Sequence, residues 1–432
     1  MAKKDKKHPN IEAPETEDAT VVFLRPADRK IPSKPEPEPA PDPEPAPGPE
    51  PDPEAEAEAE DRRLSRRDRR RTVISLVLAA VLFCACILLW LNRDRFDPDR
   101  FLVLAPEEAA EAKAEYVFDA GSGQVFATAG TGLAAATATG IQLMDADGHI
   151  AVSRLFQLET PAIAAGSDCA VFYDIGGTAM CAAFFDGTIR ELRAPGTILS
   201  ATMSAGGYLA VTTDYTGYRA LVTVYDPRLE PVYAWYSSSA WVLSAAVSPD
   251  NRQLAALCYT ASGSEVRLFR LDSEEQQAAF SVSDTVLLDV RWLSQNQLCA
   301  YSAEQAIFFT DGGTWSGAFS FDGRTLTDCA FGGEGFAAFA LSRYRGGSAS
   351  ELVTLDTAGR VLGRTEVPSE IVSLTASGTE VLVLGPDGAL LYSSSLSRKG
   401  GLSGLTGFKY ALLRSRGEAL LVSANYAEVY TF

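Results

Sequence analysis

The segment LSAAVSPDNRQLAALCY, residues Leu243–Tyr259, contains a pattern that recurs along much of this chain. An apolar run leads through a polar Ser-Pro-Asp-Asn turn into a second, alanine-rich apolar run. Two short β-prone runs joined by a tight turn are typical of a β-hairpin. The same arrangement occurs in LSATMSAGGYLAVTT from Leu199 and in LDVRWLSQNQLCAYS from Leu288, which indicates an internal repeat.

A second hairpin pattern completes each repeat. IQLMDADGHIAVSRL from Ile141 and LVTLDTAGRVLGRTE from Leu352 each join two further runs through an Asp-x-x-Gly turn. The aspartate accepts bonds from nearby backbone amides, and glycine adopts the left-handed conformation that other residues resist. Repeats of roughly 36 to 45 residues have the period of four-stranded propeller blades. We place their starts near Val125, Pro161, Ile198, Val242, Val286, Leu326, Ile371 and Tyr410.

The last repeat contains only three strand-like runs, and a candidate for its missing strand lies before the first repeat. This candidate is AEYVF, Ala114–Phe118. Pairing it into the last blade would close the ring and remove an exposed sheet edge. We therefore predict an all-β domain over residues 114–432, a β-propeller of four-stranded blades. Eight blades are favoured and seven are the alternative, because the glycine-rich residues 400–407 blur one boundary.

A basic and then apolar stretch precedes this domain. Residues 62–71 carry seven arginines, and residues 72–91 contain no charged side chain. About 20 apolar residues suffice for a transmembrane helix, and positive charge is retained on the cytoplasmic side. We expect a single span in the cell membrane, with a cytoplasmic N-terminus, a stalk over residues 92–113 and an extracytoplasmic C-terminal domain. A buried core helix would carry a polar stripe, whereas this segment has only Thr72 and Ser75. A cleaved signal peptide also fits less well, since about 70 residues precede the span.

Residues 1–61 have the composition of a disordered cytoplasmic tail. Proline alternates with acidic or small residues over Pro35–Glu54, which favours an extended polyproline II spacer. One apolar patch, Val21–Leu24, interrupts the tail. It is either a short strand that docks on a cytoplasmic partner or an accidental apolar cluster.

Several motifs carry a resemblance to known propellers. The turn Ser248–Asn251 resembles that of WD-repeat-like and TolB-like propellers, and LDTAGR from Leu355 resembles a quinoprotein-like repeat. Over residues 62–432, the chain resembles an uncharacterised family of Gram-positive bacterial single-pass membrane proteins with an outer β-propeller, known as a domain of unknown function. That resemblance implies an anchored propeller and brings no catalytic residues.

The composition excludes several classes of site. The formal net charge of −18 disfavours nucleic acid as a partner. Only His149 follows the apolar stretch, so a Ser-His-Asp triad or a multi-histidine metal site cannot be assembled there. Asp145-Ala146-Asp147-Gly148 begins like a calcium loop but lacks the later acidic ligand, so a hairpin turn is the better interpretation. We predict no metal site and no cofactor.

Cysteine usage predicts thiols and no disulfide framework. Seven cysteines leave an odd five after the apolar stretch. A turn at Gly176-Gly177 would place Cys181 opposite Phe172 and away from Cys169, so these two should not bond. We expect mostly buried free thiols that pack as small apolar side chains.

Aromatic and arginine residues are the candidate binding site. The loops between the second and third strands of a blade and the connections between blades lie on the same rim of a propeller. Trp, Tyr and Arg are the residue types that dominate binding hot spots, although propellers also need rings for packing between blades. The candidates are Tyr215, Tyr218, Trp235, Tyr236 and Trp241, together with a basic cluster of Arg343, Tyr344 and Arg345.

The favoured function is a non-enzymatic, membrane-anchored propeller that binds an envelope protein or glycan outside the cell. A propeller enzyme, either a lyase or a quinone-dependent dehydrogenase, is the first alternative, since propellers host both functions. Carboxylates, arginine and tyrosine converging at the central channel would favour the enzyme, and an aromatic patch on the rim favours binding. A passive assembly scaffold is the second alternative.

Overall fold

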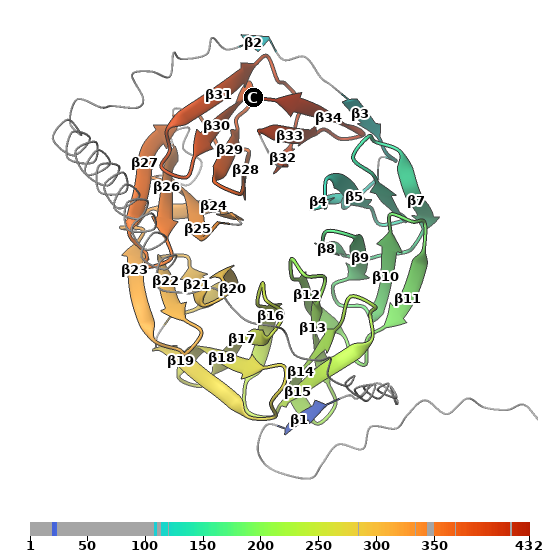
Figure 1. Ribbon diagram of the computed structural model, residues 1–432, viewed down its shortest axis with the longest axis vertical. Coiled ribbons are helices and arrows are strands. Elements are labelled where there is room, and N and C mark those ends of the chain that lie inside the picture. Colours follow the sequence, from blue (N-terminus) through green and yellow to red (C-terminus); the bar gives the residue numbers. More distant parts are fainter. Residues whose placement is uncertain are drawn as a thin grey trace, which may run out of the picture. The chain divides into compact units, whose positions relative to one another are not determined.

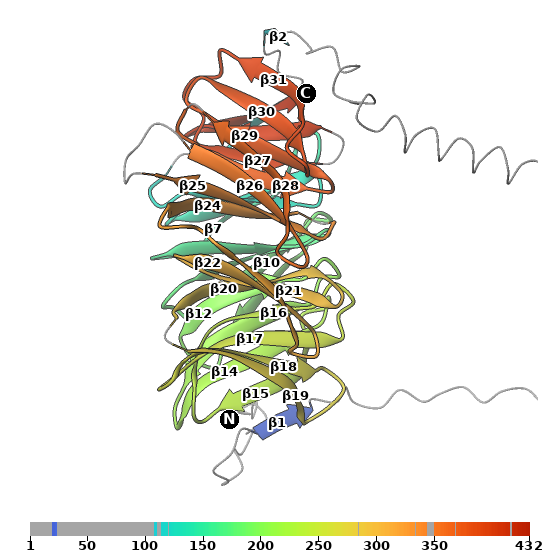
Figure 2. The same ribbon diagram turned by 90° about the vertical axis from the view of Figure 1, so that its left-hand side faces the viewer.

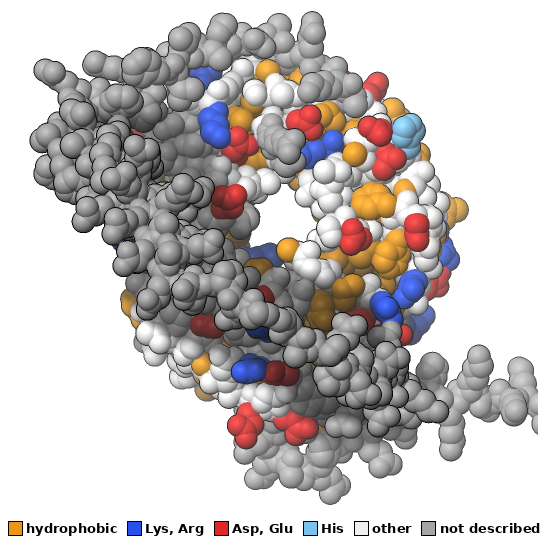
Figure 3. All heavy atoms as spheres, in the orientation of Figure 1, with side chains coloured by type: hydrophobic (Ala, Val, Ile, Leu, Met, Phe, Trp, Pro, Cys, Tyr) orange, Lys and Arg blue, Asp and Glu red, His pale blue; other side chains and the backbone are white. Residues whose placement is uncertain are grey.

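The computed structural model describes residues 20–23, 108–109 and 114–432, without 120, 284, 333, 344–349, 368 and 415–416. Within these ranges every regular element is a β-strand. Eight sheets stand around a central opening, which the space-filling view shows from one face (Figures 1 and 3). The expected all-β propeller is confirmed, and its eight blades exclude the seven-blade alternative.

Blades 1–8 are numbered in chain order, and each begins with its innermost strand (Figure 1). Blades 1–4 consist of β4 (Val125–Ala129), β5 (Gly132–Ala136), β6 (Gly140–Met144) and β7 (Ile150–Leu155); β8 (Pro161–Ala165), β9 (Cys169–Asp174), β10 (Ala179–Phe184) and β11 (Ile189–Arg193); β12 (Ile198–Met203), β13 (Leu209–Tyr215), β14 (Tyr218–Tyr225) and β15 (Pro231–Ser237); β16 (Trp241–Val247), β17 (Gln253–Thr260), β18 (Gly263–Arg270) and β19 (Gln276–Ser283).

The other four blades follow the same order and include one strand from before the first blade. Blades 5–8 consist of β20 (Leu287–Ser294), β21 (Gln297–Ser302), β22 (Gln305–Thr310) and β23 (Trp315–Ser320); β24 (Thr325–Gly332), β25 (Phe336–Ser342), β26 (Ser350–Asp356) and β27 (Val361–Val367); β28 (Ser373–Ser377), β29 (Glu380–Leu384), β30 (Gly388–Ser393) and β31 (Arg398–Ser403); β32 (Tyr410–Leu413), β33 (Glu418–Val422), β34 (Tyr426–Thr431) and β3 (Ala114–Val117).

The blades begin where the repeats predict them, within two residues at every inner strand. The turns explain this agreement, because their geometry is local. In the Asp356 turn, one carboxylate oxygen accepts bonds from the amides of Ala358 and Arg360, both at 2.9 Å. Gly359 has a φ of 76°, the left-handed conformation that the turn requires.

The ring closes through β3, as predicted from the three-run last repeat. Ala114 pairs with Val429 and Val117 with Tyr426, so β3 forms the outer strand of blade 8. The Tyr116 side chain is fully buried between blades 8 and 1. The N-terminal strand of the domain and its C-terminal blade thus share one sheet.

Polar side chains on consecutive inner strands bond one blade to the next. The strands β12, β16, β20 and β24 each contain a register shift directly before a polar residue. Ser200 Oγ donates to the Leu243 carbonyl at 2.8 Å, and Ser244 Oγ donates to Asp289 Oδ1 at 2.9 Å. Asp328 Oδ2 accepts from the Leu374 amide at 2.8 Å. These blade-to-blade bonds stabilise the wall of the central opening.

Two short strands from before the propeller are also described. Thr20–Phe23 forms β1, which pairs antiparallel with the outer edge of β15, and β1 lies beside β15 in both views (Figures 1 and 2). Glu108–Ala109 forms β2, which pairs in parallel with β31 and falls within the expected stalk. The expected docking strand Val21–Leu24 therefore overlaps a strand that pairs with this chain's own propeller.

The predicted transmembrane segment, residues 72–91, lies outside the described residues, as do the basic residues 62–71. Of the residues that the structure describes, none belongs to a helix long and apolar enough to cross a membrane.

Candidate functional site

A groove of about 640 Å³ opens on the rim of blade 3. Three chain segments form it: the connection from β11 to β12, the hairpin between β13 and β14, and the first residue of β16. The lining residues are Pro195, Gly196, Asp214, Tyr215, Thr216, Gly217, Tyr218, Arg219 and Trp241. Three of the eight candidate binding residues, Tyr215, Tyr218 and Trp241, line this one groove.

Glycines bring the first two segments together. A side chain at Gly196 would place its Cβ 1.8 Å from the Asp214 carbonyl, so only glycine allows this close approach. The Asp214 carboxylate accepts a hydrogen bond from the Thr197 amide, which ties the connection to the hairpin. Gly217 has a φ of 89° and makes the tight turn between Tyr215 and Tyr218.

The third segment is fixed by a serine. Ser237 Oγ donates to the Ala240 carbonyl at 2.6 Å and accepts from its amide at 3.3 Å, which bends the chain from β15 into β16. Trp241 follows this bend with 52% of its surface exposed. The guanidinium carbon of Arg219 lies 4.9 Å from the centroid of the Trp241 ring, within the range of a cation–π contact. Arginine and tryptophan thus form an accessible pair at the groove.

Two tyrosines that line the groove pack on a third, buried tyrosine. The Tyr236 ring centroid lies 5.4 Å from that of Tyr215 and 5.1 Å from that of Tyr218. Tyr236 is 3% exposed, and burial, together with the two neighbouring phenols, raises its pKa. Its hydroxyl therefore remains protonated over the physiological pH range, and the ring supports the two tyrosines that reach the surface.

Trp235 and Tyr236 are not surface residues, contrary to their expected place on the rim. Trp235 is fully buried and packs on Phe269 of blade 4, with ring centroids 4.6 Å apart. Each face of the blade 3 sheet is turned toward a neighbouring blade. A ring in the middle of β15 is therefore covered whichever face of the sheet it lies on. Trp235 packs blade 3 against blade 4, and Tyr236 packs on Tyr215 and Tyr218 within blade 3, so both rings have a structural role.

The predicted basic cluster lies largely outside the described residues, which exclude Tyr344 and Arg345. Arg343 is exposed, and its guanidinium lies 3.5 Å from the Glu366 carboxylate. The sequence did not single out the two charged residues of the groove, Asp214 and Arg219. The arginine directly after Tyr218, on a chain with an acidic excess, was the signal that could have found it.

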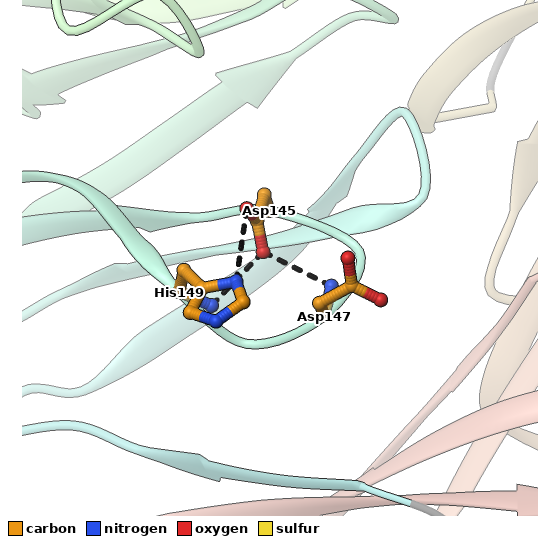
Figure 4. Close-up of side chains that lie close together, drawn as sticks. All are labelled: Asp145, Asp147 and His149. Atoms are coloured by element: carbon orange, nitrogen blue, oxygen red, sulfur yellow. Dashed lines mark hydrogen bonds and ion pairs between the residues drawn. The ribbon is translucent and has the colours of Figure 1, made fainter.

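The Asp145 turn brings three ligand-type side chains together (Figure 4). Ligand atoms of Asp145, Asp147 and His149 lie within 4.8 Å of one another. Asp145 Oδ1 accepts from the amides of Asp147 and His149 at 3.0 and 2.9 Å, and Oδ2 lies 3.5 Å from His149 Nδ1. Partial burial opposes the effect of these partners, yet together they lower the pKa of Asp145. The carboxylate serves the β6–β7 hairpin turn, as the sequence predicted.

Carboxylates near the central opening are bonded within the protein. Asp289 Oδ1 accepts from Ser244 and from the Val290 amide, and Oδ2 lies 2.7 Å from the Arg291 guanidinium. The Asp328 oxygens accept from the amides of Cys329 and Leu374 at 2.8 Å, although burial raises the pKa of this group. These groups connect inner strands, which is a structural use of the carboxylates that an enzyme would direct at a substrate.

The five described cysteines are free thiols, and all but the half-buried Cys329 are buried. Cys181 lies opposite Phe172 across the β9–β10 pair, as the position of the turn predicted. Burial raises the pKa of Cys169 to about 11 and that of Cys258 to about 12, which makes these thiols poor nucleophiles.

Solved structures of other proteins share the architecture. Sqt1 from Saccharomyces cerevisiae superposes with a TM-score of 0.53 at 9% identity, covering 76% of this chain and 100% of Sqt1. The C-terminal WD40 domain of Sif2 gives a TM-score of 0.54 at 9% identity, covering 76% of this chain and 99% of that domain. BamB from Moraxella catarrhalis gives 0.48 at 14% identity, covering 75% and 100%. The two structures with TM-scores above 0.5 show a common propeller fold, and identities of 9% leave function open.

No curated protein matches the sequence. The sequence profile of one family, the family of unknown function DUF5711, matches residues 108–399. This match covers well over half of the chain and nearly all of blades 1–7. The chain therefore belongs to the DUF5711 family.

Proposed function

We propose that this protein is a membrane-anchored, extracytoplasmic propeller that binds an envelope protein through the groove on blade 3. The single observation that carries the binding role is the exposed Trp241 with Arg219 beside it, at a groove lined by Tyr215 and Tyr218. Trp, Tyr and Arg supply most of the binding energy at protein interfaces, where a recessed site excludes water from the contact.

Contacts within the protein hold the segments that form the groove, which favours binding. Gly196, Asp214 and Ser237 fix its three segments through a close approach and hydrogen bonds within the protein. A site of this kind loses little conformational entropy on binding. The arginine among the lining residues favours a partner that presents aromatic or acidic groups at the groove, against the acidic net charge of the chain.

The membrane location in this proposal is supported by the sequence. Seven arginines precede the uncharged residues 72–91, which gives a cytoplasmic tail and an outer propeller. Reporter enzymes test this arrangement. One that is active only outside the cell should work when fused after Phe432 and should be inactive when fused at residue 60. The reverse pattern would overturn the orientation.

Binding is tested in the native membrane with a photoreactive residue at the exposed Thr216, beside the groove. We expect a discrete crosslinked partner that is lost in Trp241→Ala. The matched control is Trp315→Ala, which removes a tryptophan of nearly equal exposure, 53%, from the outer strand of blade 5. An adduct that survives Trp241→Ala, or falls equally in both variants, would overturn the site. An adduct sensitive to glycosidase and resistant to protease would replace the protein partner with a glycan.

A further inference from the structure

Among the described strands, the outer edge of β15 combines two features: its strand is uncharged, and a fifth strand pairs with it. The outer strands β7, β11, β27 and β31 contain Arg, Lys or Glu, which protect an edge from pairing with other chains. The strand β15, of sequence PVYAWYS, contains no charged residue and is rich in aromatic and apolar side chains. Two other outer strands, β19 and β23, are also uncharged. Of these three uncharged strands, only β15 has a further strand paired to its outer edge within the described residues.

The pairing of β1 shows what this edge accepts. Thr20, Val21, Val22 and Phe23 lie opposite Tyr236, Trp235, Ala234 and Tyr233 in unbroken antiparallel register. Backbone bonds of a ladder are indifferent to sequence, whereas β-branched and aromatic residues favour the extended chain. An uncharged run of this composition therefore fits the edge.

The edge leads toward the groove on blade 3. Thr20 pairs with Tyr236, whose ring packs on Tyr215 and Tyr218 at the groove. Because the pairing is antiparallel, residues before Thr20 in an added strand would run toward the groove and residues after Phe23 would run away from it. In this chain, the residues before Thr20 include Glu15, Glu17 and Asp18. Acidic residues at that place would approach the Arg219 side chain.

We infer that the outer edge of β15 is a strand-acceptor site for an extended segment of another protein, in which acidic residues directly precede an uncharged β-branched run. This inference rests on the proposed membrane topology. A single span would place Thr20–Phe23 and β15 on opposite sides of the bilayer, which leaves the edge open in the inserted protein. Strand addition would then supply affinity along β15, and the groove would supply selectivity through Arg219 and Trp241.

The probe is a synthetic peptide of residues 15–24 that carries Val22→Cys, added outside intact cells that display the full chain. In the protein, Ala234→Cys provides the partner thiol, since Ala234 lies opposite Val22. The control is Ala318→Cys on the uncharged outer strand β23. Ala318 is exposed, whereas Ala234 is 4% exposed with β1 in place, so the control reports the capture that an accessible thiol gives without strand pairing. Background from the buried thiols is low because burial raises their pKa values. We expect disulfide capture of the peptide at Ala234→Cys and not at Ala318→Cys.

Charge is tested separately. Arg219→Gln should reduce capture several-fold for the acidic peptide and leave unchanged the capture of a peptide in which Glu15, Glu17 and Asp18 are replaced by their amides. Equal capture at both cysteines would overturn the edge site. The absence of capture by Ala234→Cys would also overturn it, provided that this variant has the melting temperature of the wild type. Either result leaves the topology standing. An internal disulfide in the Val22→Cys/Ala234→Cys double variant in intact cells would show that the chain's own strand fills the edge, and would overturn this inference and the single span together.

Discussion

The Arg414 guanidinium donates a hydrogen bond to the hydroxyl of Tyr116, across a sequence separation of 298 residues. The same hydroxyl donates to the Ala146 carbonyl in the β6–β7 turn at 2.5 Å. Both side chains are buried, at 6% and 0% exposure, and desolvation raises the pKa of Tyr116, so its phenol stays protonated as a donor. One hydroxyl therefore joins the closing strand, the last blade and the first blade.

Tyr116→Phe tests this junction. The variant keeps the ring and removes the hydroxyl, which leaves the buried Arg414 and the Ala146 carbonyl without that partner. We expect a loss of about 1–3 kcal/mol in the free energy of unfolding, seen as a lower melting temperature of the full chain in detergent. The control is Tyr410→Phe, since Tyr410 is 43% exposed and should tolerate the change. Equal melting temperatures for the two variants would refute a stabilising role for the junction.

Deletion of Ala114–Phe118 tests closure as a whole. The deletion removes β3 and exposes the edge of β34, which then offers unpaired backbone groups to other molecules. We expect a lower melting temperature and concentration-dependent association in light scattering. A deletion of the same length in the tail, residues 55–59, is the control. A deletion variant that melts with the wild type and remains monodisperse would contradict closure through β3.

Trp235 and Trp241 should respond oppositely to truncation. Trp235→Ala removes a fully buried ring that contacts Phe269 and should cost roughly 3 kcal/mol or more in stability. Trp241→Ala removes a half-exposed ring and should cost about 1 kcal/mol or less. Thermal melts of the two variants, measured together, check this contrast. Comparable losses would mean that Trp241 is structural and unsuited to partner binding.

The Asp356 turn should give a pH-dependent contribution to stability. Partial burial acts to raise the pKa of Asp356, but the amides of Arg360 and Ala358 and the Arg360 guanidinium outweigh it and hold the pKa below 3.8. A carboxyl group whose pKa is lowered in the folded state stabilises the protein fully at pH values above its unfolded-state pKa. This stabilisation is lost as the pH falls through the folded-state pKa. Asp356→Asn keeps Oδ1 for both amides and removes the charge.

We expect the wild type to exceed Asp356→Asn in stability by about 1 kcal/mol or less at pH 7, because the Arg360 side chain of the ion pair is largely exposed. The difference should shrink as pH falls below 3.8. Melting temperatures of both proteins between pH 7 and 3 measure it. A difference that grows on acidification would reverse the assigned sign.

The sequence by itself determined the all-β class and the closing strand, and it favoured eight repeats over seven. These depend on local features, such as the Asp356–Gly359 turn, whose carboxylate bonds to amides two and four residues away. The strand starts followed because short apolar runs between turns leave little freedom in where a strand begins. The last repeat lacks a fourth strand-like run, and an open sheet edge is unfavourable. These two facts together pointed to Ala114–Phe118 as the closing strand.

Tertiary structure alone decided which aromatic rings are exposed. Trp235 and Trp241 are six residues apart, yet one is fully buried between blades and the other is half exposed on the rim. Alternation along a strand predicts exposure only when one face of the sheet meets water, and β15 has neighbouring blades on both faces. The partners of Arg219, Arg414 and the β15 edge were likewise invisible in the sequence. The turns depend on contacts between neighbours in the chain, whereas exposure and these pairings depend on how the closed ring brings distant segments together.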